Sequence, residues 1–315
     1  MPLAATLDAE ICEVSDAQLL AGAPLVSVLM VTFNHAGYLA EAIEGVVSQK
    51  LEFPFELIIG EDASTDETRK IALEYQRRFP EIIRVVFSQH NVGAGANIRR
   101  ITLLARGDYI AYCEGDDYWC STRKLAGQVE LIRRDQGIGV VHTDWVRSRP
   151  SGNGWTTSWG KPVHRRIRPT LLEGDLFHAF YFPKILRTCT ILVRRDVILE
   201  CEATELGLAE YRFGDTVAAA LITSRWKVAY LPEVTAVYRE SPGSLLRSGN
   251  QAKLEFLKSC LKFDSDARRF FHDRKDYPDG YRCEVLLGIL LWALRARNLE
   301  AAKLAISDLR KSYGF

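Results

Sequence analysis

Residues 25–33 read LVSVLMVTF, an unbroken run of apolar and β-branched side chains. Such a run is typical of a parallel strand that is covered on both faces of its sheet. Apolar side chains at helical spacing follow at residues 36–48, and a second apolar run, FELIIG, occupies residues 55–60. Strand, helix and strand in this order predict a βαβ unit, so the fold class that we expect is α/β.

The same alternation continues along the chain. A helix is predicted with the polar cluster 64–67 in its first turn, and further helices at 96–105, 124–134 and 215–223. Strands are predicted at 82–87, 108–113, 138–142, 188–193 and 228–238, the last broken at Pro232. Residues 147–187 lack sustained periodicity, which predicts long loops with a short helix near residues 171–179.

These patterns divide the chain into three parts. We expect an N-terminal extension at 1–23, a central α/β domain at 24–248 and a helical C-terminal region at 249–315. Within the central domain, residues 24–145 form a first half and residues 146–248 a second half. No internal repeat and no low-complexity tract interrupts this organisation.

Composition narrows the class of protein. The 315 residues are 47% hydrophobic, and 41 basic residues against 40 acidic ones give a net charge of +1. Such a balance provides no field for a polyanion, so no nucleic-acid partner is expected. Seven scattered cysteines without a CxxC pair favour a reducing compartment, and the acidic start of the chain does not resemble a signal peptide, so we expect a cytoplasmic protein.

One apolar run, residues 285–294, is about half as long as the roughly twenty residues that a membrane-spanning helix needs. We interpret it as a buried helix, with a position at a membrane surface as the alternative.

Three predicted strands end in polar side chains that can bind a ligand. Residues 32–35 read TFNH, residues 61–66 read EDASTD and residues 114–117 read EGDD. Ligands of open α/β sheets bind beyond the carboxyl ends of the strands, so these side chains are expected in one crevice. Crowded carboxylates need a cation or hydrogen-bond donors to compensate them, and oxygen ligands suit Mg²⁺ or Mn²⁺. Asp116 and Asp117 therefore predict a metal that bridges the protein and a diphosphate; the competing interpretation is a solvated loop.

The first strand is not followed by the glycine-rich phosphate loop that two other classes of nucleotide-binding protein require. Neither GxGxxG nor GxxxxGK[ST] follows the first strand. The sequence thus disfavours a dehydrogenase and a P-loop NTPase.

Taken together, the segments resemble the family 2 glycosyltransferases, which have the GT-A fold. PLVSVLMVTFNHAGYLAEAI (24–43) is similar to that family's opening strand and helix, FELIIGEDASTDET (55–68) to its nucleotide-base segment and GDYIAYCEGDDYW (107–119) to its DxD-type metal segment. TCTILVRRD (188–196) and residues 212–248 resemble its acceptor-binding half. The resemblance runs from about Leu25 to Ser248, and 24–145 would then be the nucleotide-sugar-binding half.

The resemblance implies a metal-dependent, inverting transfer of a sugar. The donor would be a nucleotide diphosphate sugar, typically a UDP-sugar, and the acceptor a hydroxyl of a saccharide or lipid-linked saccharide in bacterial surface polysaccharide or lipopolysaccharide assembly. The runner-up interpretations are a metal-dependent nucleotidyltransferase and a nucleotide-sugar-binding protein without catalysis. The helical region would either dock the enzyme at the inner membrane face or form a homodimer interface.

Donor-binding residues follow from the resemblance position by position. Thr32 and Asn34 would line the nucleotide pocket, although both could simply cap a strand end. Glu61 and Asp62 would lie next to the nucleotide, and Asp62 would form a hydrogen bond with the base. Asn97 and Arg100 would provide polar side chains that bind the donor. Arg100 also fits a position on the protein surface.

Catalytic residues follow in the same way. Asp117 would ligate Mn²⁺ or Mg²⁺ directly, and Asp116 would contact the ribose or the ligand shell of the metal. Asp215 would be the catalytic base, although an aspartate also suits a helix N-cap. Many relatives carry a histidine after a Tyr-Arg pair, whereas ESPG follows Tyr238-Arg239 here. Phosphate neutralisation would then fall to Arg239 or Arg247, or be absent at this end.

Overall fold

A computed structural model describes residues 11–182, 185–241 and 249–314 of the chain. Its centre is a mixed sheet with the strand order β1-β4-β3-β2-β5-β9-β7-β10-β6, to which β8 adds at the side of β7. The strands are β1 (Cys12–Val14), β2 (Val26–Thr32), β3 (Phe55–Glu61), β4 (Ile83–Phe87), β5 (Tyr109–Tyr112), β6 (Tyr118–Trp119), β7 (Ile138–Ser151), β8 (Gly154–Thr157), β9 (Leu192–Arg194) and β10 (Lys227–Arg239).

Strands β2 to β5 are parallel to one another, as the βαβ pattern predicts. Strand β9 runs antiparallel to both β5 and β7 and so joins the two halves of the sheet. Strand β1 pairs with β4, which makes part of the N-terminal extension an edge strand. The central α/β architecture is therefore confirmed.

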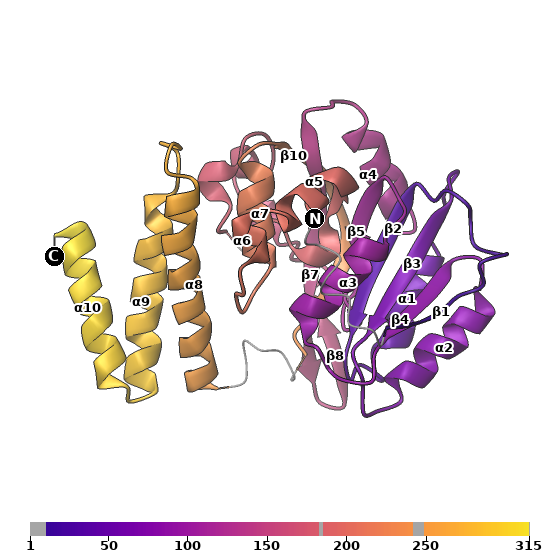
Figure 1. Ribbon diagram of the computed structural model, residues 1–315, viewed down its shortest axis with the longest axis horizontal. Coiled ribbons are helices and arrows are strands. Elements are labelled where there is room, and N and C mark those ends of the chain that lie inside the picture. Colours follow the sequence, from indigo (N-terminus) through magenta and orange to yellow (C-terminus); the bar gives the residue numbers. More distant parts are fainter. Residues whose placement is uncertain (1–10, 183–184, 242–248, 315) are drawn as a thin grey trace.

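Helices cover both faces of this sheet (Figure 1). One hydrophobic cluster joins β2 residues such as Met30 to α1 (Leu39–Val47), α2 (Thr68–Arg78) and α4 (Lys124–Ile132). The other joins Leu29 to α3 (Ala94–Leu104), α5 (Arg195–Glu202), α6 (Glu205–Leu208) and α7 (Asp215–Thr223). Neighbouring side chains of a strand point to opposite faces, which explains why every residue of the run 26–30 is buried.

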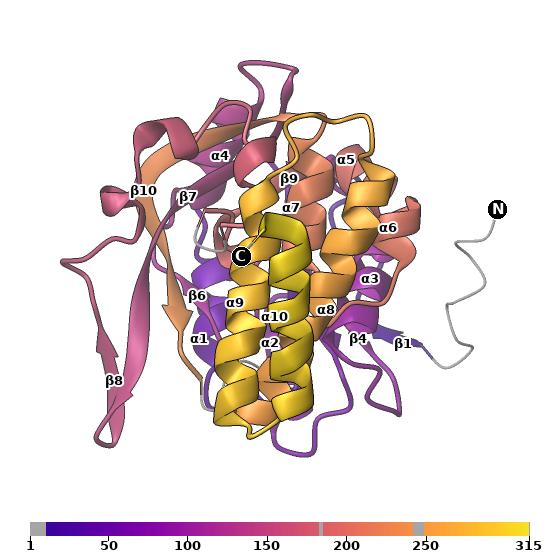
Figure 2. The ribbon, with the colours of Figure 1, turned by 90° about the vertical axis from the view of Figure 1, so that its left-hand side faces the viewer.

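The last three helices lie side by side at one end of the long axis (Figures 1 and 2). They are α8 (Asn250–Phe270), α9 (Asp279–Arg295) and α10 (Leu299–Tyr313). Helix α8 joins the core, since the fully buried Phe263 packs against Tyr211 and Phe180. Among the described residues, no helix combines the length and apolar character that crossing a bilayer requires.

Two sequence predictions on the second half are wrong in part. Strand β7 does not end at His142 but continues to Ser151, because β10 pairs with it in parallel up to Ser148 and β8 pairs with its last four residues. The expected helix near 171–179 is replaced by two 3₁₀ turns, Pro169–Leu171 and Phe177–Ala179. The predicted break at Pro232 is confirmed as a register shift between β10 and β7, since proline has no N–H for the ladder.

Two boundaries and the burial of one helix also differ from the prediction. Helix α2 begins at Thr68 rather than in the cluster 64–67, because Asp66 Oδ1 accepts the N–H of Thr68 (3.0 Å) ahead of the helix. The predicted strand at 188–193 starts with a 3₁₀ turn, Thr188–Thr190. The apolar run 285–294 lies in α9 and is buried on one side only.

Candidate functional site

The three polar strand ends meet in space. The N–H of Asp62, after β3, donates to the carbonyl oxygen of Thr32 at the end of β2 (3.1 Å). The N–H of Gly115, after β5, donates to the carbonyl oxygen of Val31 (3.0 Å). A Cβ at Gly115 would lie 2.7 Å from Thr32 Oγ1, so this approach requires glycine. The carboxyl edge of the sheet thus gathers the polar segments after β2, β3 and β5.

Asn34 connects the loops after β2 and β3. Its side-chain oxygen accepts the N–H of Thr65 (2.8 Å), and its own N–H donates to Ser64 Oγ (3.0 Å). Its φ of 55° lies in the left-handed region, which asparagine tolerates better than most residues. Thr32 is buried, and its hydroxyl lies 3.3 Å from His35 Nδ1. Both residues are at the sheet edge, Asn34 exposed and Thr32 beneath it.

Glu61 and Asp62 are both buried and hold neighbouring loops. Glu61 accepts the N–H of Ser64 (2.6 Å) and the Nε–H of Arg69 (2.5 Å). The carboxylate of Asp62 accepts the N–H groups of Val92 (2.8 Å) and Gly93 (2.9 Å) just before α3. Asp62 therefore fixes the segment after β4 against the end of β3.

Asn97 and Arg100, on α3, form a buried polar layer beneath these strand ends. Asn97 Nδ2 donates to the carbonyl oxygen of Gly60 (2.7 Å), and Arg100 Nη2 donates to that of Glu61 (2.7 Å). Arg100 Nε also donates to Asn97 Oδ1 (2.9 Å). A surface position for Arg100 is wrong, because only 6% of the residue is exposed. Its guanidinium instead lies against the end of β3, where the acids Glu61 and Asp62 follow one another.

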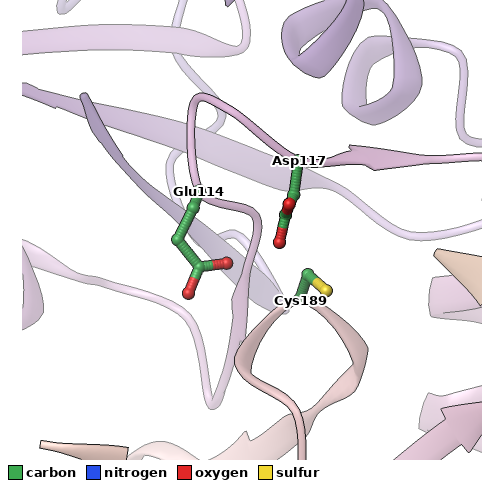
Figure 3. Close-up of side chains that lie close together, drawn as sticks. All are labelled: Glu114, Asp117 and Cys189. Carbon is green, nitrogen blue, oxygen red and sulfur yellow. The ribbon is translucent and has the colours of Figure 1, made fainter. Parts of the chain in front are cut away.

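Two side chains of the acidic loop after β5, Glu114 and Asp117, form a cluster of possible metal ligands with Cys189 (Figure 3). Their nearest oxygen and sulfur atoms all lie within 4.8 Å of one another. Cys189 enters from the 3₁₀ turn Thr188–Thr190, so the cluster joins both halves of the sheet.

Asp117 is 2% exposed, and its Oδ1 accepts the N–H of Arg239 (2.8 Å). Burial, then the charges of Asp116 and Glu114, raise the pKa of Asp117 well above its usual range. Burial and the charge of Asp116 also raise the pKa of Glu114, to about 7. Glu114 Oε2 is buried and has no hydrogen-bond partner. These carboxylates are thus short of compensating charge.

A divalent cation fits this set of side chains. Carboxylate oxygens are the ligands that Mg²⁺ and Mn²⁺ prefer, and a cation would relieve the repulsion among Glu114, Asp116 and Asp117. Burial raises the pKa of the Cys189 thiol well above its usual range. Because Mg²⁺ and Mn²⁺ prefer oxygen to sulfur, the candidate ligands are the carboxylates.

Arg239 and Ser241, at the end of β10, fasten the acidic loop. Ser241 Oγ donates to Asp116 Oδ2 (2.8 Å), and Arg239 Nη1 donates to the carbonyl oxygen of Asp116 (3.1 Å). Arg239 also forms an ion pair with Glu41 of α1, and its guanidinium lies 4.4 Å from the ring centroid of Tyr118. The cation that we expected to neutralise phosphate is thus already bonded within the protein. Arg247 lies outside the described residues.

Asp215 is exposed at the first position of α7, and its Oδ1 accepts the N–H of Thr216 (2.8 Å). Among the described residues it has no hydrogen bond or ion pair to the acidic loop. Its geometry therefore supports a role in starting the helix and leaves the role of base as a prediction.

Some residues of the site escape sequence reasoning. Cys189 and Ser241 reach the acidic loop from more than 70 residues away, and no local pattern announces them. Arg187 also escaped, although its charge lowers the pKa of Glu114 and its Nε is buried without a partner. Glu114 stands in the quoted EGDD segment, but nothing in that segment indicated that its side chain would be the unpartnered one.

Comparisons with known proteins agree on one family. The family described as Glycosyl transferase family 2 matches residues 27–196. A putative teichuronic acid biosynthesis glycosyltransferase, TuaG of Bacillus subtilis (strain 168), is 35% identical over 109 residues, which are 35% of this chain and 42% of that protein. The chain spans about a third to a half of the length of the curated relatives that it matches.

Two solved structures share the fold. The mannosyltransferase PcManGT from Pyrobaculum calidifontis, in complex with GDP-Man and Mn²⁺, is 16% identical with a TM-score of 0.56, covering 92% of this chain and 76% of that one. Residues 1–349 of TarS from S. aureus, in complex with UDP-GlcNAc, are 15% identical with a TM-score of 0.53, covering 91% of each chain. The expected GT-A fold is confirmed.

Proposed function

The chain belongs to glycosyl transferase family 2, and we propose that it transfers a sugar from a nucleotide diphosphate donor, of the UDP-sugar class, to an acceptor hydroxyl with inversion of the anomeric carbon. The observation that carries this proposal is the acidic loop after β5, beside the carboxyl end of β2, where Glu114 Oε2 is buried without a partner. A site that binds a cation and a diphosphate together explains why Glu114 Oε2 is buried next to two further carboxylates without a hydrogen-bond partner.

We assign the metal, Mn²⁺ or Mg²⁺, to Asp116 and Asp117, with Glu114 as a further oxygen ligand. A divalent cation at this position supplies neutralisation of the negative charge that develops on the departing diphosphate. The protein holds Asp116 and Asp117 in place through Ser241 and Arg239, so the ligands are positioned before the donor binds.

The remaining assigned residues position the donor and activate the acceptor. Thr32 and Asn34 line the nucleotide pocket, with Asp62 at the base and with Glu61, Asn97 and Arg100 supporting these strand ends. Asp215 accepts the proton of the acceptor hydroxyl, and attack from the face opposite the leaving group inverts the anomeric centre. A positioned base contributes roughly 10²–10⁴-fold to such a step.

We further propose that the acceptor is a saccharide or lipid-linked saccharide of a cell-surface polysaccharide and that the reaction takes place on the cytoplasmic side of the membrane. The name of TuaG supports this class of acceptor, and the UDP-GlcNAc bound to TarS supports a UDP-sugar as the donor. GDP-Man bound to PcManGT makes guanine nucleotide donors the necessary comparison. The proposed division at residue 249 assigns catalysis to the sheet domain and a docking role to the helices.

The test is nucleotide release from a panel of UDP- and GDP-sugars with Mn²⁺, with and without saccharide acceptors. We expect UDP release that depends on both metal and acceptor. Pyrophosphate release from a nucleoside triphosphate and a sugar phosphate would indicate a nucleotidyltransferase instead. Donor binding without any release would indicate a binding protein.

Asp215→Asn tests the base. We expect transfer to fall by about 10²–10⁴-fold while the affinity for UDP stays unchanged, because the substitution removes the proton acceptor and keeps an oxygen for the N–H of Thr216. The matched control is Glu210→Gln, which removes an exposed carboxylate just before α7. Normal turnover in Asp215→Asn would disprove the assignment.

A further inference from the structure

Helices α9 and α10 carry an unusual concentration of exposed apolar side chains. Six of the thirteen exposed large hydrophobic residues in the described chain lie between residues 287 and 306: Leu287, Leu291, Leu294, Leu299, Leu304 and Ile306. Exposed apolar residues scattered singly are normal on a protein surface, but a concentration of them marks an interaction site.

On α9 these side chains form a stripe. Leu287, Leu291 and Leu294 follow one another at helical spacing and are 52%, 47% and 54% exposed. The opposite side of the same helix, including Val285 and Ile289, is buried in the core. The stripe is therefore surplus to the packing of α9 against α8 and α10. Leu299 and Leu304 on α10 are more exposed still, at 66% and 62%.

No described element lies over the outer side of these helices. Figure 1 places α10 at the far end of the molecule from the sheet, and Figure 2 shows α9 and α10 facing the viewer. The surface is thus accessible to a large, flat partner without any displacement of the sheet domain.

The charge around the leucines identifies that partner. Between residues 284 and 311 the chain has three acidic residues, Glu284, Glu300 and Asp308, and five exposed basic ones, Arg295, Arg297, Lys303, Arg310 and Lys311. None of these five cations forms an ion pair with a carboxylate of the described residues. Leucines next to unpaired lysines and arginines are typical of a helix that lies in the interface of an anionic bilayer.

We propose that the outer surface of α9 and α10, from Leu287 to Lys311, docks on an anionic lipid bilayer. Binding of a second copy is less favourable, because a two-fold interface would bring this net positive surface against itself. This proposal names the partner for the docking role that is proposed above for the helices. It does not depend on catalysis, because the surface is separate from the sugar-transfer site.

Co-sedimentation with vesicles tests the proposal. The full chain should bind vesicles of phosphatidylcholine mixed with phosphatidylglycerol, bind pure phosphatidylcholine at least about tenfold more weakly and lose binding in high salt. The triple variant Leu287→Gln, Leu291→Gln, Leu294→Gln should lower the partition coefficient about tenfold or more. The control Leu208→Gln alters an equally exposed leucine on α6 and should change nothing.

Arg297→Gly separates lipid binding from folding. Arg297 has a φ of 55° between α9 and α10, a conformation that glycine adopts with less strain. The variant should therefore be at least as stable as the natural chain, yet bind anionic vesicles about fivefold more weakly. The control Lys50→Glu, an exposed cation outside the C-terminal helices, should bind as before.

Three outcomes would overturn the proposal. One is the absence of vesicle binding by the natural chain, and another is equal binding to neutral and anionic vesicles. The third is light scattering that shows a dimer which the triple variant turns into a monomer, without lipid binding in either. Nucleotide release with a soluble acceptor should stay unchanged in all these variants, so failure here is distinguishable from failure of the proposed catalysis.

Discussion

Asp62, Asn97 and Asp117 each use side-chain atoms to fix the backbone of a neighbouring segment: Val92 and Gly93, Gly60, and Arg239 respectively. The two aspartates serve both the shape of the site and its charge, whereas Asn97 serves its shape. The two contributions can be separated, because asparagine keeps an acceptor oxygen where aspartate also supplies a negative charge. An alanine would remove both.

His142 provides a prediction for pH dependence. It is fully buried, its Nε2 lies 2.6 Å from the carbonyl oxygen of Leu172, and burial lowers its pKa to about 3. Below about pH 6.5 the His142 imidazole is therefore protonated in the unfolded chain but stays neutral in the folded chain. The contribution of the neutral His142 to the free energy of unfolding is fully present above about pH 6.5 and is lost as the pH falls towards about 3. Between about pH 6.5 and 5 the loss is about 2 kcal/mol.

The measurement is urea unfolding at pH 7 and pH 5. His142→Gln keeps a donor for Leu172 but does not titrate, so its free energy of unfolding should fall by about 2 kcal/mol less than that of the natural chain. His178→Gln, at an exposed position, is the control and should behave like the natural chain. Equal pH dependence in all three proteins would contradict the account.

Residues near a strand end could be predicted from the sequence, and those that arrive from elsewhere could not. Thr32, Asp62 and Asp117 follow apolar runs, and parallel strands bring such ends to one edge. Ser241 and Cys189 lie there only because β10 and the turn before β9 run beside β5 and β6. That neighbourhood depends on strand order, which no local pattern contains.

At the scale of elements, helix α1 packs its backbone closely on the backbone of β6. A Cβ at Gly45 of α1 would lie 2.7 Å from the carbonyl oxygen of Trp119. Gly45→Ala should therefore destabilise the protein by about 1–3 kcal/mol, although alanine is the better helix former by about 1 kcal/mol. A free energy of unfolding that rises in this variant would show that the contact is loose.

Gly127→Ala in α4 is the matched control for the same urea measurement. A Cβ there would meet only Leu231 Cδ2, at 3.0 Å, the flexible end of a side chain. This variant should keep its stability or gain up to about 1 kcal/mol. The difference between the two alanines isolates the backbone contact from helix propensity.

Elements covered on both faces were the ones that sequence patterns located well. Strands β2 and β3 and helix α7 have the predicted positions within a residue or two. The continuation of β7 past His142 was missed because the polar residues Thr143 and Asp144, although buried, interrupt the apolar pattern, and because its last residues, RPS, leave the core in a hairpin with β8. Hydrophobic periodicity reports burial, so a strand that leaves the core gives little signal.

At the scale of the whole molecule, the C-terminal helices are part of the core. Phe263 of α8 packs on Phe180 and Phe213, and Phe271 packs on Phe177. Deleting residues 250–315 should therefore expose an aromatic surface and give an aggregated or unfolded protein, as size-exclusion chromatography and circular dichroism would show. A soluble, folded fragment would show instead that the sheet domain is independent.

The central claim is that the acidic loop holds a divalent cation that grips a nucleotide diphosphate, and calorimetric titration of UDP with Mn²⁺ or with EDTA tests it most directly. The natural chain and the control Asp273→Asn, at an exposed position, should bind UDP at least about tenfold more tightly with Mn²⁺. Asp117→Asn should lose this enhancement but keep its stability, since asparagine can still accept the N–H of Arg239. Equal affinity of the natural chain for UDP with and without metal would contradict the account.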